Sequence, residues 1–260
     1  MRADQLLVER GLAASRSQAS RLIASGLRWR DGAQWRSVGK SGQEVPVDAE
    51  LELADAGETR YVSRGGLKLE GALVAAGIDV RDKRCLDVGQ STGGFTDCLL
   101  QQGARHVVGV DVGHEQLHPR LRGDARVTAL EGVNARALDA STLGGAPFDL
   151  IVGDLSFISL TLVLPSLQPV LASEGELLML VKPQFELQPA QIGKRGIVRD
   201  AALYAVVEQR LRTACKALGL QVRGWFDSPI AGGDGNREFF IHAAPASGTP
   251  GAGRAPSVEL

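Results

Sequence analysis

Residues 84–97, Arg-Cys-Leu-Asp-Val-Gly-Gln-Ser-Thr-Gly-Gly-Phe-Thr-Asp, constrain the fold more than any other stretch of this 260-residue chain. The apolar run around Asp87 predicts a buried strand, the glycines predict a bend, and the residues after Gly94 predict the first turn of a helix. Gly93 and Gly94 let the backbone approach a ligand closely, and Ser91 or Thr92 could cap the helix. Doubly wound α/β sheets bind ligands at such a bend, so we expect a ligand site here.

The spacing of these glycines argues against a dinucleotide. The fingerprint G-x-G-x-x-G is absent, because three other residues follow Gly89. An acidic residue just before the bend, Asp87, suits a ligand with a cationic amino-acid group. The form D-x-G-x-x-x-G-G-F resembles motif I of S-adenosylmethionine-dependent methyltransferases. That resemblance implies cofactor contacts from Asp87, Gly89, Ser91, Thr92, Gly93, Gly94 and Phe95, whereas a strand–turn–helix without a ligand is the plainer alternative.

Further apolar runs predict the rest of an α/β fold, a Rossmann-like sheet with helices on both faces. We expect strands over residues 104–111, 127–130, 148–154, 174–182, 221–227 and 238–242, and helices over 63–77 and 201–218. Asp111 lies 22 residues beyond Gly89, about where an acidic side chain binds a ribose, although it could instead cap a helix. Asn134 follows the third strand and is a candidate contact to adenine.

Polar residues end two of these strands. Asp154 follows the fourth, and Lys182 follows the fifth, where an ammonium in an apolar setting must reach solvent or a partner. Glu238 begins the last predicted strand. Lys68 lies off the apolar face of the helix over 63–77, a position where a lysine is ordinarily solvated. If the α/β order is right, these four residues converge on the crevice beside Gly89.

The first 57 residues have a different character. Two helical repeats occupy residues 2–26, and an Asp31-Gly32 turn predicts a hairpin. Residues 1–40 carry eight Lys and Arg against three Asp and Glu, a local charge of +5, and residues 41–60 carry −5. Seven of those eight cations are arginines, whose guanidinium pairs bidentately with phosphate. A solvated arginine face is the plainer explanation, but the composition favours an RNA partner.

Motifs along the whole chain resemble the TlyA family of ribosomal RNA 2′-O-methyltransferases, also known as haemolysins, whose catalytic domain is FtsJ-like. The motifs are Y-V-S-R-G-G-x-K-L, D-L-S-F-I-S-L, V-K-P-Q-F-E and G-x-x-G-N-x-E-F-F. The resemblance implies an enzyme that uses S-adenosyl-L-methionine, with ribosomal RNA or ribosomal subunits as partner. It also implies a catalytic set of Lys68, Asp154, Lys182 and Glu238.

The amino-terminal pattern, R-x-D-x-L-L, S-R-x-x-A and L-I-x-x-G before the D-G turn, resembles the S4 RNA-binding domain. This implies RNA contacts from Arg2, Arg16, Arg21, Arg28 and Arg64. The expected domains are an S4-like module over residues 1–57, a linker over 58–62, a methyltransferase domain over 63–243 and a disordered tail over 244–260, rich in Pro, Gly, Ala and Ser.

Methyl transfer to a ribose hydroxyl needs a positioned oxygen, loss of its proton and in-line alignment, and no metal. The resemblance implies that Lys182 contacts the 2′-oxygen while Asp154 holds that lysine near the methyl donor. A free lysine has a pKa of about 10.4, and a general base works best nearer 7. The choice between a base and an electrostatic clamp therefore stays open.

Other features limit the alternatives. Cys85, Cys98 and Cys215 lie in apolar patterns without metal-ligand spacing, which predicts buried thiols in a reducing compartment. No secretory signal or membrane span is predicted, so we expect a cytoplasmic protein. Gln90 occupies a position that is commonly small in the family and could crowd the cofactor. A membrane-active haemolysin and an RNA-binding protein with an inactive catalytic domain remain the alternatives, and the sequence does not indicate an oligomeric state.

Overall fold

The computed structural model describes residues 1–13, 15–24, 26–32, 34–53, 60–193, 196–232 and 235–246. The chain divides into two compact units, Met1–Arg64 and Gly65–Leu260. Three predictions lie wholly or partly outside the described part of the chain. They concern the Arg21 side chain, residues 58 and 59 of the predicted linker, and the tail from residue 247.

The first unit packs two helices against a small antiparallel sheet. The helices are α1 (Ala3–Glu9) and α2 (Arg16–Ala24), and the strands are β1 (Leu27–Asp31), β2 (Gln34–Ser37) and β3 (Leu51–Leu53), in the order β2-β1-β3. Asp31 pairs with Gln34, and Gly32 has a φ of +59°, as the predicted turn requires. The core combines the apolar residues of α1 and α2, such as Leu6, Leu7 and Leu22, with Leu27 of β1.

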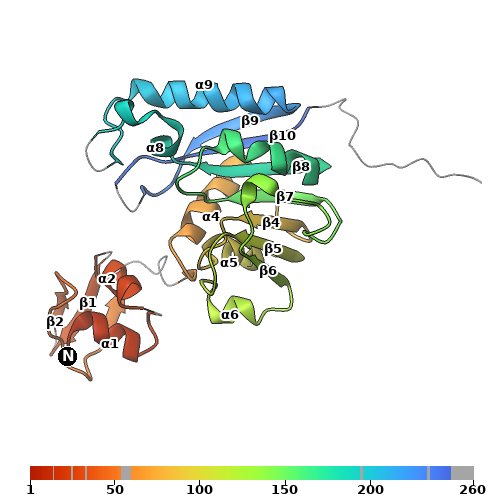
Figure 1. The fold of residues 1–260 in the computed structure, drawn as a ribbon. Helices are drawn as coiled ribbons and strands as arrows, with labels where there is room; N and C mark the ends of the chain where they lie inside the picture. Colours follow the sequence, from red (N-terminus) through yellow and green to blue (C-terminus); the bar gives the residue numbers. More distant parts are fainter. Residues whose placement is uncertain are drawn as a thin grey trace, which may run out of the picture. The chain divides into compact units, whose positions relative to one another are not determined.

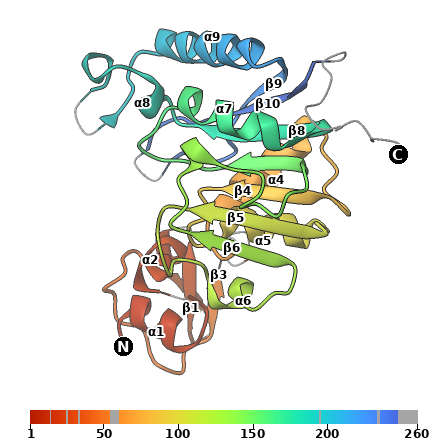
Figure 2. The same ribbon diagram turned by 45° about the vertical axis from the view of Figure 1, so that its right-hand side comes forward.

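The second unit is built on a seven-stranded sheet. Figures 1 and 2 show its strands stacked one above another, from β9 at the top to β6 at the bottom. The order is β6-β5-β4-β7-β8-β10-β9, and β10 runs antiparallel to both of its neighbours. The strands are β4 (Arg84–Val88), β5 (His106–Asp111), β6 (Val127–Glu131), β7 (Phe148–Gly153), β8 (Leu171–Val181), β9 (Leu220–Asp227) and β10 (Phe239–Pro245). The predicted α/β class is confirmed.

Helices cover both faces of this sheet, as predicted. Neighbouring strand residues point to opposite faces, and the Phe240 ring stacks on Phe95 of α5 while the Phe239 ring contacts Tyr204 of α9. The helices are α4 (Gly65–Ala76), α5 (Gly94–Gln101), α6 (Pro119–Arg122), α7 (Leu164–Leu167), α8 (Pro183–Glu186) and α9 (Ala202–Ala217). Short 3₁₀ turns lie at η1 (Ala135–Ala137), η2 (Leu160–Leu162), η3 (Gln168–Val170) and η4 (Pro189–Gln191).

The central strands read as continuous apolar runs because both of their faces are covered. Leu150, Ile151 and Val152 in β7 are fully buried. From β4 the chain winds outward through β5 and β6 and then returns to β7 on the other side of β4. The topological switch point therefore lies between β4 and β7, where a crevice opens at the carboxyl ends of the strands.

Several predicted boundaries are wrong. Strand β8 begins at Leu171, not at residue 174, and β10 begins after Glu238 and continues to Pro245. The predicted tail, which begins at residue 244, therefore starts too early, because Ala244 is buried and pairs with Gln221 of β9. Helix α5 is capped by Gly93 in a left-handed conformation, and neither Ser91 nor Thr92 caps it.

Candidate active site

The glycine bend and Asp154 meet at the switch point. The Asp154 N–H donates to the Val88 carbonyl at 3.0 Å, which joins the ends of β4 and β7. Gly89 has a φ of +84°, and a Cβ built there would lie 2.6 Å from the Asp154 carbonyl oxygen. A side chain at position 89 would therefore push the two strand ends apart. Glycine is required here for close approach as well as for backbone conformation.

Asp87 lies fully buried at the end of β4. Its Oδ2 accepts a hydrogen bond from Thr96 Oγ1 at 2.7 Å, whereas Oδ1 is buried with no hydrogen-bond partner. Burial raises the pKa of this carboxyl to about 7, and the Thr96 hydrogen bond opposes that rise only in part. An orphaned carboxylate oxygen is costly to bury, so this atom is suited to a cationic or hydrogen-bond-donating ligand.

The Gln90 side chain does not extend into the crevice. Its side chain is buried, and its Nε2 donates to Thr96 Oγ1 at 2.9 Å. The side chain fills the space above Gly109 of β5, where a Cβ would lie 2.0 Å from Gln90 atoms. Gly109 thus makes room for the larger residue, and Gln90 supports the Thr96–Asp87 hydrogen bond instead of extending freely from the bend.

Of the other predicted cofactor residues, Asp111 faces the bend, whereas Asn134 caps a 3₁₀ turn and Phe95 packs in the core. Asp111 accepts hydrogen bonds from the Ser91 and Gly113 amides at 2.8 and 2.7 Å, which holds the bend against the end of β5. A carboxylate has lone pairs left for a diol after two such bonds. Asn134 is exposed and accepts from the Arg136 amide as the cap of η1. Phe95 is buried in a ring stack with Phe240, so its side chain packs in the core.

Lys182 and Asp154 form an ion pair at the mouth of the crevice. Lys182 Nζ lies 2.5 Å from Asp154 Oδ1 and donates to Ser156 Oγ at 2.8 Å. The side chains are 13% and 24% exposed, so both are largely screened from solvent yet can be reached. Pro183 occupies the first turn of α8 directly after Lys182. It ends the strand and fixes where the lysine emerges.

Lys68 and Glu238 form a second, more deeply buried pair. Lys68 Nζ donates to Glu238 Oε2 at 2.5 Å, with side chains only 10% and 3% exposed. The plainer alternative, a solvated lysine, does not hold, because the partner of Lys68 comes from a segment 170 residues away that helix periodicity cannot reveal. Burial raises the pKa of Glu238, and the Lys68 ammonium opposes that rise.

The two pairs belong to one electrostatic cluster. The charge of Asp154 also raises the pKa of Glu238, and the charge of Lys182 lowers it. Strand pairing explains why: Phe239 is opposite Val181 in the β10–β8 ladder, so Glu238 and Lys182 leave adjacent strands at the same end of the sheet. The structure therefore brings Lys68, Asp154, Lys182 and Glu238 together.

An exposed aromatic residue beside this cluster was not singled out from the sequence. Phe157 is 91% exposed, with a φ of +64°, and its ring lies 5.0 Å from that of Phe185. The two rings line a hollow of about 550 Å³ together with Arg136, Ile158, Ser159 and Leu162. A bulky residue in the left-handed region is strained and persists only when the surrounding structure holds it. Within the motifs D-L-S-F-I-S-L and V-K-P-Q-F-E, two phenylalanines so near the charged residues were the available signal.

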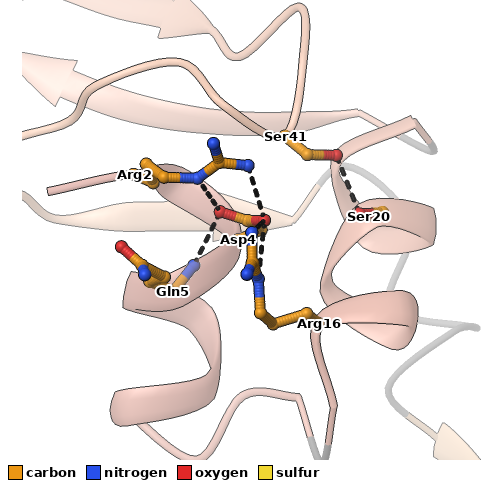
Figure 3. A network of polar contacts seen from close by, with 6 residues as sticks. All are labelled: Arg2, Asp4, Gln5, Arg16, Ser20 and Ser41. Atoms are coloured by element: carbon orange, nitrogen blue, oxygen red, sulfur yellow. Dashed lines mark hydrogen bonds and ion pairs between the residues drawn. The ribbon is translucent and has the colours of Figure 1, made fainter.

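In the first unit, three of the predicted RNA-binding arginines form ion pairs with carboxylates. Figure 3 shows Arg2 and Arg16 converging on the buried Asp4 carboxylate, with N–O distances of 3.0 and 2.7 Å. These two guanidinium groups hold the pKa of Asp4 far below its usual range. Arg28 pairs with Glu52 at 2.7 Å across the β1–β3 ladder. Of these three arginines, only Arg28 is paired with the acidic segment that follows residue 40, and each of the three remains about half exposed.

Arg64, the fifth predicted RNA contact, is half-buried at the end of the first unit.

Comparison with known proteins identifies the family. Residues 61–244 match the model of the FtsJ-like methyltransferases. The chain belongs to the FtsJ-like methyltransferase family. It is 45% identical, over 92% of its length and 88% of the relative's, to the 16S/23S rRNA (cytidine-2′-O)-methyltransferase TlyA of Mycobacterium tuberculosis. Hemolysin A of Brachyspira hyodysenteriae is 37% identical over 93% of this chain and 99% of its own.

A solved structure extends the likeness of this FtsJ-like protein to both units. A Streptococcus thermophilus protein, described provisionally as a hemolysin, superposes with a TM-score of 0.74 at 39% identity. The match covers 96% of this chain and 91% of that one. The family predicted from the motifs, and with it the prediction of a methyltransferase, is confirmed.

The bend of this FtsJ-like chain fits the methyl donor on which the family depends. It offers an orphaned buried carboxylate oxygen on Asp87, two glycines whose Cβ atoms would collide with their surroundings, and a carboxylate on Asp111 with free lone pairs. Within the described ranges, no three His, Cys, Asp or Glu side chains are grouped as a metal ion would require. None of the described helices has both the length and the apolar character needed to cross a bilayer.

Proposed function

We propose that this protein transfers a methyl group from S-adenosyl-L-methionine to a ribose 2′-hydroxyl of ribosomal RNA. The observation that carries the proposal is the ion pair of Lys182 and Asp154 at the switch point, next to the glycine bend. The name of the relative TlyA gives the substrate class, rRNA, and the position, the cytidine 2′-oxygen. The buried Lys68–Glu238 pair completes the catalytic set that the motifs suggested.

Residues of the bend would hold the cofactor, which supplies an electrophilic methyl group on a cationic sulfur. Asp87 Oδ1 would accept a hydrogen bond from the ligand's cationic amino-acid end. Gly89 and Gly93 would hold the bend in its left-handed turns, packed against Asp154 and Leu121, so that its backbone can face the ligand. Asp111 would accept from a ribose diol. Ser91, Thr92 and Gly94 would contribute backbone contacts, whereas Phe95 acts from the core and Asn134 from a helix cap.

The charged residues would act on the ribose. Lys182 Nζ would contact the 2′-oxygen, and Asp154 would hold the ammonium in place. The 2′-oxygen would take the methyl group that the cofactor supplies, and the hydroxyl proton would pass to Lys182 or to water. Lys182 stabilises the alkoxide as that proton departs, or takes it if the lysine is neutral. Lys68 and Glu238 position the cluster from behind, because they are too deeply buried to contact a large substrate directly.

The exposed Phe157 ring, which packs on the half-buried Phe185, supports an RNA substrate over a small molecule. Base–aromatic stacking is worth roughly 1–3 kcal/mol per base, and Phe157 presents nearly its whole side chain beside Lys182 and Asp154. Arg136 borders the same hollow. A nucleotide next to the target would stack there, while the ribose reaches the lysine.

The first unit would supply additional RNA contacts as an S4-like module. We keep the domain limits predicted from the sequence as part of the proposal: an S4-like module over residues 1–57, a linker over 58–62 and a methyltransferase domain from residue 63. Arg2, Arg16 and Arg28 remain partly exposed even though each bonds a carboxylate, so phosphates would compete with Asp4 and Glu52 for them. An enzyme that acts on ribosomal RNA works where ribosomes are made, so the cytoplasmic location stays with this proposal.

Tritiated methyl transfer to ribosomal RNA and to isolated subunits tests the function. Lys182→Ala and Asp154→Ala should each lower the rate by at least about 100-fold, the range of positioned acid–base groups. Lys216→Ala and Asp79→Ala change exposed lysine and aspartate residues of the same unit and should leave the rate unchanged. Undiminished transfer in both site variants would refute the site.

The two alternatives give different results. A membrane-active haemolysin, suggested by the name of the Brachyspira relative, would release dye from liposomes at nanomolar protein concentration, and we expect no release. An inactive catalytic domain would bind no S-adenosylmethionine, and calorimetry should instead show one site.

A further inference from the structure

Glu186 is a buried carboxylate beside the active site to which no role has been given so far. It ends α8, four residues after Lys182, and is only 3% exposed. Its Oε2 accepts from Ser159 Oγ at 2.6 Å, and its Oε1 accepts from the Leu160 amide at 2.7 Å. Burial raises the pKa of the Glu186 carboxyl, and these two hydrogen bonds oppose the rise. The carboxylate is therefore fully engaged with the end of one loop.

That loop, residues 155–159, is here called the active-site loop. It begins directly after Asp154 and carries Ser156, which accepts from Lys182, and Phe157, which lies exposed. Three contacts join it to the segment that starts at Lys182: Lys182 to Ser156, Phe185 to Phe157, and Glu186 to Ser159. The Glu186 contact is reinforced by a second, buried hydrogen bond from the Leu160 amide, directly after the loop.

The active-site loop needs such an anchor. Phe157 has a φ of +64°, a strained conformation for a bulky residue that persists only when its surroundings hold it. Glu186 is itself held, since Arg210 Nη1 of α9 donates to its carbonyl at 2.5 Å. A rigid helix thus fixes α8, and α8 fixes the loop.

We propose that Glu186 is a positioning residue for the methyl transfer: it locks the active-site loop to α8 and so sets the geometry between Asp154 and Lys182. The inference rests on the proposed function for its catalytic consequence. Its structural part, that Glu186 holds the loop, stands independently. The competing explanation is that Glu186 only completes the cap of η2, where Ser159 already accepts from the Thr161 amide. That role would affect stability and leave the geometry of Lys182 unchanged.

Hydrogen exchange on the full chain tests the structural part. In Glu186→Ala the Leu160 amide loses its acceptor, so exchange in peptides covering residues 155–162 should become at least about tenfold faster. Glu186→Gln keeps one acceptor oxygen, so its exchange rate should lie between those of the wild type and Glu186→Ala. The ¹⁵Nζ resonance of Lys182 should also shift in Glu186→Ala. Unchanged exchange and an unchanged Lys182 resonance would overturn the inference, whatever the enzyme's activity.

Kinetics test the catalytic part. Glu186→Ala should reduce kcat between about tenfold and about a hundredfold, as expected for misplacement on the ångström scale, with calorimetric affinity for S-adenosylmethionine within twofold of wild type. Glu186→Gln should recover part of the loss. Cys215→Ala, which removes a buried thiol of α9, serves as a control for reduced stability and should keep kcat.

The outcomes separate the two proposals. A loss of kcat that follows melting temperature equally in Glu186→Ala and Cys215→Ala would overturn the positioning role. If the wild-type chain transfers no methyl to RNA, the proposed function fails, and the exchange and resonance measurements still decide whether Glu186 holds the loop.

Discussion

Replacing Lys68 by methionine would leave the buried Glu238 carboxylate without its ion-pair partner. Methionine keeps most of the lysine stem's volume, so the change removes the charge with little effect on packing. Glu238 is 3% exposed and bonds Lys68 at 2.5 Å. Removing one partner of a buried ion pair costs about 3–5 kcal/mol. At about 2–4 °C per kcal/mol for a unit of this size, we expect the second unit to melt roughly 6–20 °C lower.

The same variant should show a definite pH dependence. Burial already raises the pKa of Glu238 while Lys68 opposes it, so loss of Lys68 raises that pKa further. A carboxyl with a raised folded-state pKa binds its proton more tightly when folded, and the protein loses stability as pH rises from the unfolded pKa to the folded one. Between those limits the loss is about 1.4 kcal/mol per pH unit. Lys68→Met should therefore be closer to wild type at pH 5 than at pH 8.

Urea unfolding followed by Trp225 fluorescence is the assay. Trp29 and Trp35 are the other two tryptophans, and changing both to phenylalanine leaves Trp225, in β9 opposite Ile241, to report on the second unit. Lys83→Met is the matched control, because its partner Glu176 keeps His242 and Arg223 nearby. Lys68→Met/Glu238→Leu should regain most of the stability. A Lys68→Met cost below about 1 kcal/mol at pH 8, or equal costs at both pH values, would refute the reasoning.

Two further predictions concern the glycine bend. Burial raises the pKa of Asp87 to about 7, so its carboxyl is mostly protonated at pH 6 and mostly ionised at pH 8. Calorimetry should therefore show S-adenosylmethionine affinity rising by up to about tenfold over that range, and Asp87→Asn should bind weakly at every pH. Gly109→Ala places a Cβ 2.0 Å from the Gln90 side chain, so it should lower both melting temperature and cofactor affinity; Gly109→Ala/Gln90→Ala should recover the melting temperature, and no recovery would contradict the packing described for Gln90.

The sequence predicted what local pattern determines. The strand, glycine bend and helix around Gly89 form as expected, because each step depends on residues adjacent in the chain. Polar residues at strand ends, Asp154 and Lys182, could also be found, since parallel strands bring their carboxyl ends to one edge.

Features set by long-range packing could not be predicted. Helix periodicity alone leaves Lys68 on a solvated face, and the family motifs were needed to place it with Glu238, because that partner lies in another segment. Gln90 appeared to crowd the crevice because nothing in its own motif reveals the space above Gly109. The charge of the first 40 residues suggested an open basic face, but the β1–β3 register pairs Arg28 with Glu52.

The position of the transferred methyl group tests the central claim most directly. A 2′-O-methyl group removes the neighbouring nucleophile that alkali needs to cleave the RNA backbone. After reaction with tritiated S-adenosylmethionine and complete alkaline hydrolysis of the RNA, the label should appear in an alkali-resistant dinucleotide, and this product should vanish with Lys182→Ala. Label recovered only in mononucleotides would place the methyl group on a base and contradict the account.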